Sequence, residues 1–225
     1  MHSKNEITKT IDDLSISTPE RYNSDYVSSI KDVLESAMLA HRRLLGIRFD
    51  LRYPTDHSYS IDEVDNPNFR RREYAKTMSR FIDSLKSKIS ADLHSKKRKR
   101  LRVYGTGVFY IWCREQNQSD NEHYHVILLL NHDEYHALGK YGDDNLSEII
   151  VESWQSATGI TSRQSHRCVY FSNTYRLKQN KEQFGFHLSR FFNEACYLAK
   201  KETKNYGSRR KNFGTSRPFN EAYLK

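Results

Sequence analysis

Two histidines, His123 and His125, flank a tyrosine in the stretch HYHVILLL, whose composition predicts a β-strand over 123–130. Side chains two positions apart on a strand point to the same face, so the two imidazoles should project together. Glu115 lies eight residues before His123, at the end of another predicted strand and across an expected hairpin. One carboxylate and two imidazoles suit Mg²⁺ or Mn²⁺ with positions open for substrate oxygens. The alternative is a group of polar surface residues at the mouth of a hairpin.

Tyr197 lies near the end of the last predicted helix but outside its apolar stripe. The stripe has spacings of four, three, four and three and consists of Phe184, Leu188, Phe191, Ala195 and Leu198. Lys200 and Lys201 follow Tyr197 by three and four residues. Nearby cations favour a phenolate and neutralise an adjacent phosphate, and a phenolate is a competent nucleophile. The alternative is a half-buried tyrosine whose hydroxyl and neighbouring lysines are solvated.

The charge balance favours a polyanionic partner, most simply nucleic acid. The 225 residues include 37 Lys and Arg against 28 Asp and Glu, a formal net charge of +9. The run over 94–102 either contacts a phosphate backbone or forms a solvated helix end that complements the helix dipole. The cations that we expect to contact DNA are Lys96, Lys97, Arg98, Lys99, Arg100, Lys204, Arg209, Arg210, Lys211 and Arg217.

Several classes of protein are excluded by what the sequence lacks. No apolar run approaches the roughly 20 residues of a bilayer span, so we expect no membrane association. The polar N-terminus lacks the apolar core of a secretory signal, which predicts a cytoplasmic protein. The three cysteines are widely spaced and include no C-x-x-C pair, which argues against a disulfide framework and against a zinc knuckle. The absence of a G-x-x-x-x-G-K-[ST] motif excludes a fused helicase.

The elements that must position these residues alternate between helices and strands. We expect residues 1–23 to be a flexible segment, 24–206 to form a single domain beginning with a helix over 24–43, and 207–225 to be a basic tail. Within the domain we predict strands over 43–53, 103–114, 123–130 and 167–172, and helices after Asn66-Pro67, after Asn145 and over 182–203. This order predicts an α+β fold in which helices pack on a ferredoxin-like or RRM-like antiparallel sheet of about five strands.

Three motifs, taken in their order along the chain, resemble those of the HUH endonucleases. They are Glu115, the H-Y-H of 123–125 and the segment Tyr197-Leu-Ala-Lys200. This superfamily contains rolling-circle replication initiators, relaxases and single-strand transposases. More narrowly, the chain resembles the initiators of filamentous phages (inoviruses) and their prophage relatives, in which an LRxDL strand (here 47–51), YLAK and FGTSR (here 213–217) recur together. The resemblance covers roughly residues 44–217, and Tyr124 departs from the aliphatic residue common between the two histidines.

The resemblance implies a function. Glu115, His123 and His125 would hold one Mg²⁺ or Mn²⁺, and Tyr197 would attack a DNA phosphodiester to leave a 3′-hydroxyl and a 5′-phosphotyrosine. Lys200, or in its place Lys201, would neutralise phosphate or phenolate charge. The substrate would be single-stranded or locally extruded origin DNA, nicked and rejoined to start rolling-circle replication of a phage or prophage in the bacterial cytoplasm. A host helicase and polymerase would complete replication.

Two other functions remain open from the sequence. One is a non-catalytic, basic DNA-binding phage protein, either a regulator or a single-strand binder. The other is a metal-dependent phosphodiesterase that does not use the tyrosine. Tyr206 is a remote candidate for a second nucleophile. Asp50 is either a carboxylate that supports a metal ligand or an ion-pair partner of Arg48 or Arg52.

Overall fold

The computed structural model describes residues 4–53, 76–115, 122–140, 145–160, 162–204 and 210–218. The chain divides into two compact units, the first comprising 1–50, 104–137 and 171–225, and the second 51–103 and 138–170. Each unit is assembled from separate stretches of sequence, so no boundary along the chain separates them. The predicted helix entry at Asn66-Pro67 lies outside the described residues.

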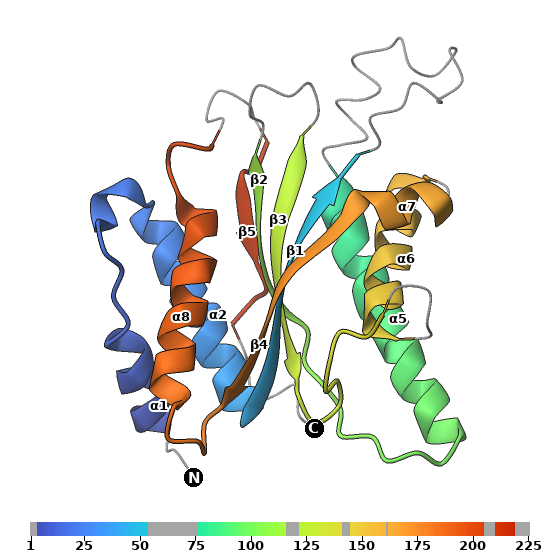
Figure 1. Ribbon diagram of the computed structural model, residues 1–225, viewed down its shortest axis with the longest axis horizontal. Coiled ribbons are helices and arrows are strands. Elements are labelled where there is room, and N and C mark those ends of the chain that lie inside the picture. The colour runs from blue at the N-terminus through green and yellow to red at the C-terminus, as the bar shows by residue number, and fades with distance from the viewer. Residues whose placement is uncertain are drawn as a thin grey trace. The chain divides into compact units, whose positions relative to one another are not determined.

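Most of the sheet belongs to the first unit. Five strands form one open antiparallel sheet in the order β4-β1-β3-β2-β5 (Figure 1). They are β1 (Arg43–Arg52), β2 (Phe109–Glu115), β3 (His123–Asn131), β4 (Val169–Lys178) and β5 (Phe213–Thr215). The predicted α+β class with an antiparallel sheet of about five strands is therefore confirmed.

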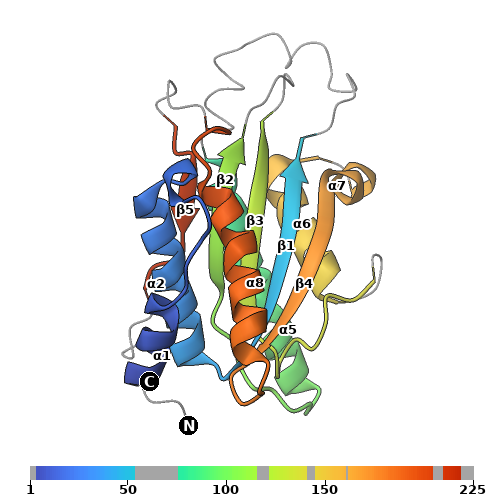
Figure 2. The ribbon, with the colours of Figure 1, turned by 60° about the vertical axis from the view of Figure 1, so that its left-hand side comes forward.

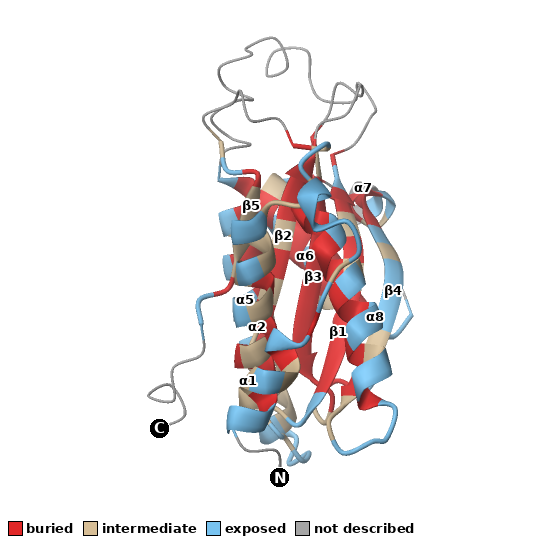
Figure 3. Ribbon diagram, turned by 90° about the vertical axis from the view of Figure 1, so that its left-hand side faces the viewer, coloured by how far each residue is buried: buried red, intermediate tan, exposed pale blue. Residues whose placement is uncertain are grey.

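Three helices of the first unit cover one face of this sheet. They are α1 (Lys4–Asp12), α2 (Ser24–Ala40) and α8 (Phe184–Cys196), seen side by side in Figure 2. Ile30 of α2 and Phe191 of α8 are fully buried in a common core with Ile127 of β3. Burial of apolar surface by these faces is the main force that holds α8, and with it Tyr197, against the sheet. Figure 3 shows the central strands buried and β4 largely exposed.

A glycine permits the close approach of α8 to β1. A Cβ atom on Gly46 of β1 would lie only 2.6 Å from Cε2 of the buried Phe191 ring. Real Cβ atoms essentially never come so close to another heavy atom, so a side chain at position 46 would force the tightly packed Phe191 ring to shift.

The last helix is shorter than its sequence predicts. In place of a helix to residue 203, α8 ends at Cys196 and is followed by the 3₁₀ turn η2 (Tyr197–Ala199). Ala199 then accepts a hydrogen bond from the Asn23 N–H, and Lys200 forms a β-bridge with Tyr22. These pairings replace the helical hydrogen bonds, a case of tertiary contacts overriding local helix propensity.

The second unit contains α5 (Thr77–Arg98), α6 (Leu146–Thr158) and α7 (Ser162–Cys168). Trp154 of α6 is fully buried, and its Nε1–H donates to the carbonyl of Arg52 at 2.9 Å. The predicted ends of α6 are confirmed, because the Asn145 side chain accepts the Ser147 N–H and Gly159 has φ 72°. The fourth strand starts at 169 rather than 167, since α7 occupies the preceding residues. None of the described helices is long and apolar enough to span a membrane.

Both ends of the first unit differ from prediction. Residues 1–23 were expected to be flexible, but α1 and the 3₁₀ turn Pro19–Arg21 lie there, and Ile7 and Ile11 are buried in the core. Within the predicted basic tail, β5 pairs with β2, and the Phe213 ring stacks on that of Tyr26 at 4.2 Å between centroids. In each case apolar side chains gain burial that a solvated segment would forgo.

Replacing Ile11 with alanine is expected to lower the free energy of unfolding by about 2–5 kcal/mol, because it leaves a cavity between α1 and the core. Urea denaturation followed by circular dichroism measures the loss. The exposed Lys9→Ala variant is the control, with an expected change within about 0.5 kcal/mol. Equal stabilities of the two variants would mean that α1 contributes nothing to the core.

Candidate metal centre and neighbouring tyrosine

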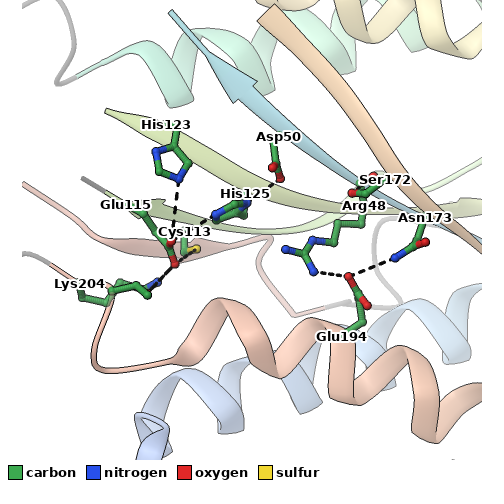
Figure 4. A network of polar contacts seen from close by, with 11 residues as sticks. Arg48, Asp50, Cys113, Glu115, His123, His125, Ser172, Asn173, Glu194 and Lys204 are labelled. Atoms are coloured by element: carbon green, nitrogen blue, oxygen red, sulfur yellow. Dashed lines mark hydrogen bonds and ion pairs between the residues drawn. The ribbon is translucent and has the colours of Figure 1, made fainter. Parts of the chain in front are cut away.

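The register of β2 and β3 brings the three predicted metal ligands together. Glu115 pairs directly with His123, and Cys113 pairs with His125. The possible ligand atoms of Glu115, His123 and His125 all lie within 4.8 Å of one another (Figure 4). Glu115 Oε2 lies 3.3 Å from His125 Nε2 and 3.9 Å from His123 Nε2. The cluster is therefore compact enough for one ion to contact all three side chains.

The surroundings of His125 fit a metal ligand. Its Nδ1 lies 2.6 Å from Asp50 Oδ1, which leaves Nε2 directed at Glu115. A carboxylate on one imidazole nitrogen fixes the ring and raises the basicity of the other nitrogen, a common arrangement behind metal-bound histidines. One carboxylate oxygen and two ring nitrogens form a donor set that could hold a divalent metal ion. Of the two roles considered for Asp50, the geometry agrees with support of a ligand.

Glu115 is also held from the segment that follows Tyr197. Its other oxygen, Oε1, accepts hydrogen bonds from Thr203 Oγ1 at 2.6 Å and from Lys204 Nζ at 2.9 Å. The Lys204 side chain is completely buried in this ion pair. The Lys204 ammonium group thus neutralises a carboxylate inside the protein, a position that does not agree with the predicted contact with DNA.

The electrostatic environment sets the protonation of the cluster. Burial alone would raise the pKa of Glu115, but hydrogen bonds from His125, Thr203 and Lys204 outweigh it and hold that pKa far below its ordinary value. Burial would lower the pKa of His125, and its contacts with Asp50 and Glu115 outweigh this and raise it. Without a cation, the pocket thus stabilises a carboxylate and favours a protonated imidazole. A divalent cation would take the place of that proton.

A Glu115→Gln variant tests this balance through stability. At pH 7 we expect its free energy of unfolding to fall by about 3–5 kcal/mol, since Lys204 keeps a buried charge without its partner. The low folded-state pKa of Glu115 makes its contribution fully present above the unfolded value of about 4.3 and progressively lost below it. The difference in unfolding free energy between the wild type and Glu115→Gln should therefore decrease as the pH falls. Urea titrations from pH 7 to pH 3 measure it.

The control for this series is Glu202→Gln, which removes a fully exposed carboxylate paired with Arg21. This variant should behave like the wild type, since exposed ion pairs contribute little. If the loss of unfolding free energy in Glu115→Gln were independent of pH, the lowered pKa of Glu115 in the folded protein would be contradicted.

Tyr197 lies next to the candidate metal cluster. It is the first residue of η2, its side chain is partly exposed, and its ring centroid lies 6.4 Å from that of His125. Lys200 Nζ lies 3.9 Å from the centre of the Tyr197 ring, as predicted for a cation beside the phenol. The guanidinium of Arg48 lies 5.1 Å from the same ring. The Tyr197 ring thus lies close to two cations and to the His125 imidazole.

A second polar network, missed by the sequence reading, holds Arg48 in place. Glu194 of α8 accepts hydrogen bonds from Arg48 and Asn173 (Figure 4). It also accepts one, at 3.2 Å, from the hydroxyl of Tyr175. The available signal was the alternation in β1, where Arg48 and Asp50 share one face and Ile47, Phe49 and Leu51 are buried on the other. That pattern indicates which way Arg48 points, but its partner lies 146 residues away.

The remaining predicted cations are scattered. Lys201 donates to the backbone carbonyl of Glu20 and so does not reach Tyr197. Lys96 pairs with Asp92 within α5, and Arg210 pairs with Glu122. Exposed positions are held by Lys97, Arg98, Lys99 and Arg100 of the second unit and by Lys211 and Arg217 of the first. Arg209 and Tyr206 lie outside the described residues.

The fold and cluster together define an α+β protein with a candidate metal site beside a tyrosine. Residues 8–216 match the family described as YagK/YfjJ C-terminal domain, and the chain belongs to this family. It is 34% identical to YagK of Escherichia coli (strain K12) over 199 residues, covering 85% of this chain and 92% of that protein. It is 32% identical to YfjJ of the same strain over 198 residues, covering 85% and 93%. Both relatives are described as uncharacterized, and no solved structure matches the chain.

Proposed function

We propose that this protein nicks and rejoins single-stranded DNA through a covalent tyrosine intermediate, as an initiator of rolling-circle replication of the HUH type. The observation that carries the proposal is the 6.4 Å separation between the rings of His125 and Tyr197. A phosphodiester between them would be within reach of the cluster on one side and of the phenol on the other. The motifs that resemble HUH initiators contribute these same residues, on an open antiparallel sheet.

The covalent step exchanges one phosphate ester for another. The phenolic oxygen of Tyr197 attacks the phosphorus in line with the departing 3′-oxygen, the P–O3′ bond breaks, and a 5′-phosphotyrosine forms. The phenolic proton is lost to solvent or a base, and the 3′-oxygen takes up a proton as it leaves. Attack by a 3′-hydroxyl on the phosphotyrosine reverses the sequence and rejoins the strand, so no other source of bond energy is required.

Two kinds of charge stabilise the reaction. The ammonium of Lys200 and the guanidinium of Arg48, both beside the Tyr197 ring, offset the negative charge of phenolate and phosphate. A divalent ion held by Glu115, His123 and His125 would polarise the scissile phosphate and add to this stabilisation. Asp50 holds the His125 ring in the orientation that serves such an ion.

A single strand is the substrate that suits this site. The candidate metal cluster and the phenol of Tyr197 must approach one phosphate from two sides. A base-paired duplex would obstruct this approach, whereas an unpaired or extruded strand would permit it. We expect the protein to depend on a host helicase for unwinding and on a host polymerase for synthesis, in the bacterial cytoplasm.

The test is a covalent adduct. The purified protein is incubated with end-labelled single-stranded origin DNA and Mn²⁺, and the products are separated on a denaturing gel. We expect a labelled protein band that EDTA abolishes, and peptide mass spectrometry should locate the nucleotide on the peptide containing Tyr197. Metal-dependent cleavage without an adduct would support a phosphodiesterase that does not use the tyrosine. Binding without cleavage would support a non-catalytic DNA-binding protein.

A further inference from the structure

A groove of about 820 Å³ lies between β4 and the N-terminal part of α8, entirely within the first unit. One wall is the edge strand of the sheet, and the other is a helix face and the turn before it. None of the residues that line it is among the cations predicted to contact DNA. Its polar lining includes Asn173, Arg176, Lys178, Lys181, His187 and Arg190.

The groove is strongly cationic. Arg176, Lys178, Lys181 and Arg190 line it against a single carboxylate, Glu182. Three of these cations are exposed and Lys178 is half-buried, so their charges can meet a ligand from solvent. Such a concentration of positive charge along a trough attracts a polyanion rather than an apolar peptide.

The helical wall of the groove leads to the tyrosine. Gln183, His187, Arg190 and Glu194 follow one another at spacings of four, three and four, which places them on one face of α8. The next step of three residues reaches Tyr197. From Gln183 to Tyr197 this face runs about 21 Å, at 1.5 Å per residue.

The strand wall is connected to the same place. Asn173 and Tyr175 of β4 both donate hydrogen bonds to Glu194, and Glu194 holds the Arg48 guanidinium that lies over the Tyr197 ring. Two residues that line the groove, Asn173 and Tyr175, are thus connected through Glu194 to the Arg48 guanidinium beside the Tyr197 ring.

We propose that this groove is the track for the single-stranded DNA that flanks the phosphodiester presented to Tyr197. This inference rests on the proposed function and adds the path of its substrate. Arg176, Lys178 and Arg190 contact successive phosphates. Phe186, which is 61% exposed and has the Arg190 guanidinium 5.8 Å from its ring, offers a surface on which a base stacks.

A pair of charge-matched variants tests the track. Arg176→Gln/Lys178→Gln removes two groove cations, and Lys4→Gln/Lys9→Gln removes two exposed cations of α1 elsewhere in the same unit. Binding of fluorescent oligothymidylate is measured by anisotropy in EDTA, where no cleavage occurs, over a series of salt concentrations. We expect the groove variant to bind several-fold more weakly, with a slope of log K against log salt that is smaller by about 1.4, since each single-strand phosphate contact contributes about 0.7. The control variant should retain the wild-type slope.

Equal slopes for the two variants would overturn the track. Tight binding of polyglutamate that the groove substitutions weaken as much as DNA binding would also overturn it, in favour of an acidic protein partner. The adduct assay keeps the two proposals separate. If the wild type forms the Tyr197 adduct but the groove and control variants bind DNA alike, the track fails and the function stands. If the groove variant loses DNA binding but the wild type forms no adduct, the groove still binds single-stranded DNA, and the presentation of a phosphodiester to Tyr197 fails together with the proposed function.

Discussion

The Tyr197→Phe variant is expected to bind single-stranded DNA with wild-type affinity and to form no covalent adduct. Loss of the hydroxyl removes the only atom of this side chain that can bond to phosphorus, so the rate of cleavage should fall on the order of 10⁴-fold or more. The phenyl ring keeps its packing beside His125 and Arg48, so the fold and the candidate metal cluster should be unaffected. Denaturing gels measure the adduct, and anisotropy measures binding.

Two other tyrosines make the result specific. Tyr104→Phe alters a comparably exposed tyrosine of the first unit and should leave adduct formation unchanged. Tyr206→Phe alters the second candidate nucleophile and should likewise form the adduct. An adduct that survives Tyr197→Phe and disappears in Tyr206→Phe would transfer the role to Tyr206.

Loss of either imidazole should abolish metal binding and cleavage together. In His123→Gln or His125→Gln the cluster keeps only two of its three donors. Removing a group that merely supports a ligand costs about 10–100-fold in affinity, so we expect the Kd for Mn²⁺ to rise by more than about 100-fold. Asp50→Asn weakens the hydrogen bond that orients His125, and it should raise the Kd for Mn²⁺ by about 10–100-fold. Isothermal titration calorimetry with Mn²⁺ measures all three.

His136→Gln is the matched control, because it removes an exposed histidine of the first unit outside the cluster. It should bind Mn²⁺ as the wild type does. Wild-type Mn²⁺ affinity in His125→Gln, or an adduct that persists in EDTA, would show that Glu115, His123 and His125 are not the functional metal ligands.

The candidate metal cluster could be predicted because its geometry is local. Glu115, His123 and His125 lie within eleven consecutive residues, and a single hairpin register decides whether they meet. The two strands pair in this register over seven residues, from Phe109 opposite Leu129 to Glu115 opposite His123. The cap residues of α6 were predictable for the same reason, because each acts on its own turn.

The rest of the site depends on contacts that no local pattern encodes. Asp50 reaches His125 across 75 residues, and Lys204 reaches Glu115 across 89. A lysine read along the sequence is expected at the surface, and only the fold shows that Lys204 is buried against a carboxylate. The 3₁₀ turn at Tyr197 likewise follows from a bridge to Tyr22, far away in the chain.

Short elements at the two ends of the chain were missed for a different reason. The helix α1 has nine residues, too few for stability in isolation, and it forms because Ile7 and Ile11 are buried against the core. The strand β5 has three residues and is defined by its pairing with β2 rather than by composition. Such short elements have weak intrinsic helix or strand propensity, and they form because of their contacts with the rest of the fold.

Gly46 sets how closely α8 approaches the sheet, and so it affects the distance between Tyr197 and the candidate metal cluster. The Phe191 ring occupies the volume that a methyl group on residue 46 would need. The distance between α8 and β1 at this point therefore leaves room only for the hydrogen atom of a glycine. Tyr197 follows Phe191 by six residues, in the 3₁₀ turn that directly follows α8, whereas the imidazoles belong to β3 of the sheet. An alanine at this position would force the Phe191 ring or its helix to shift. Under the proposed function, we expect such a shift to separate Tyr197 from the imidazoles and to reduce cleavage, although residue 46 contacts neither.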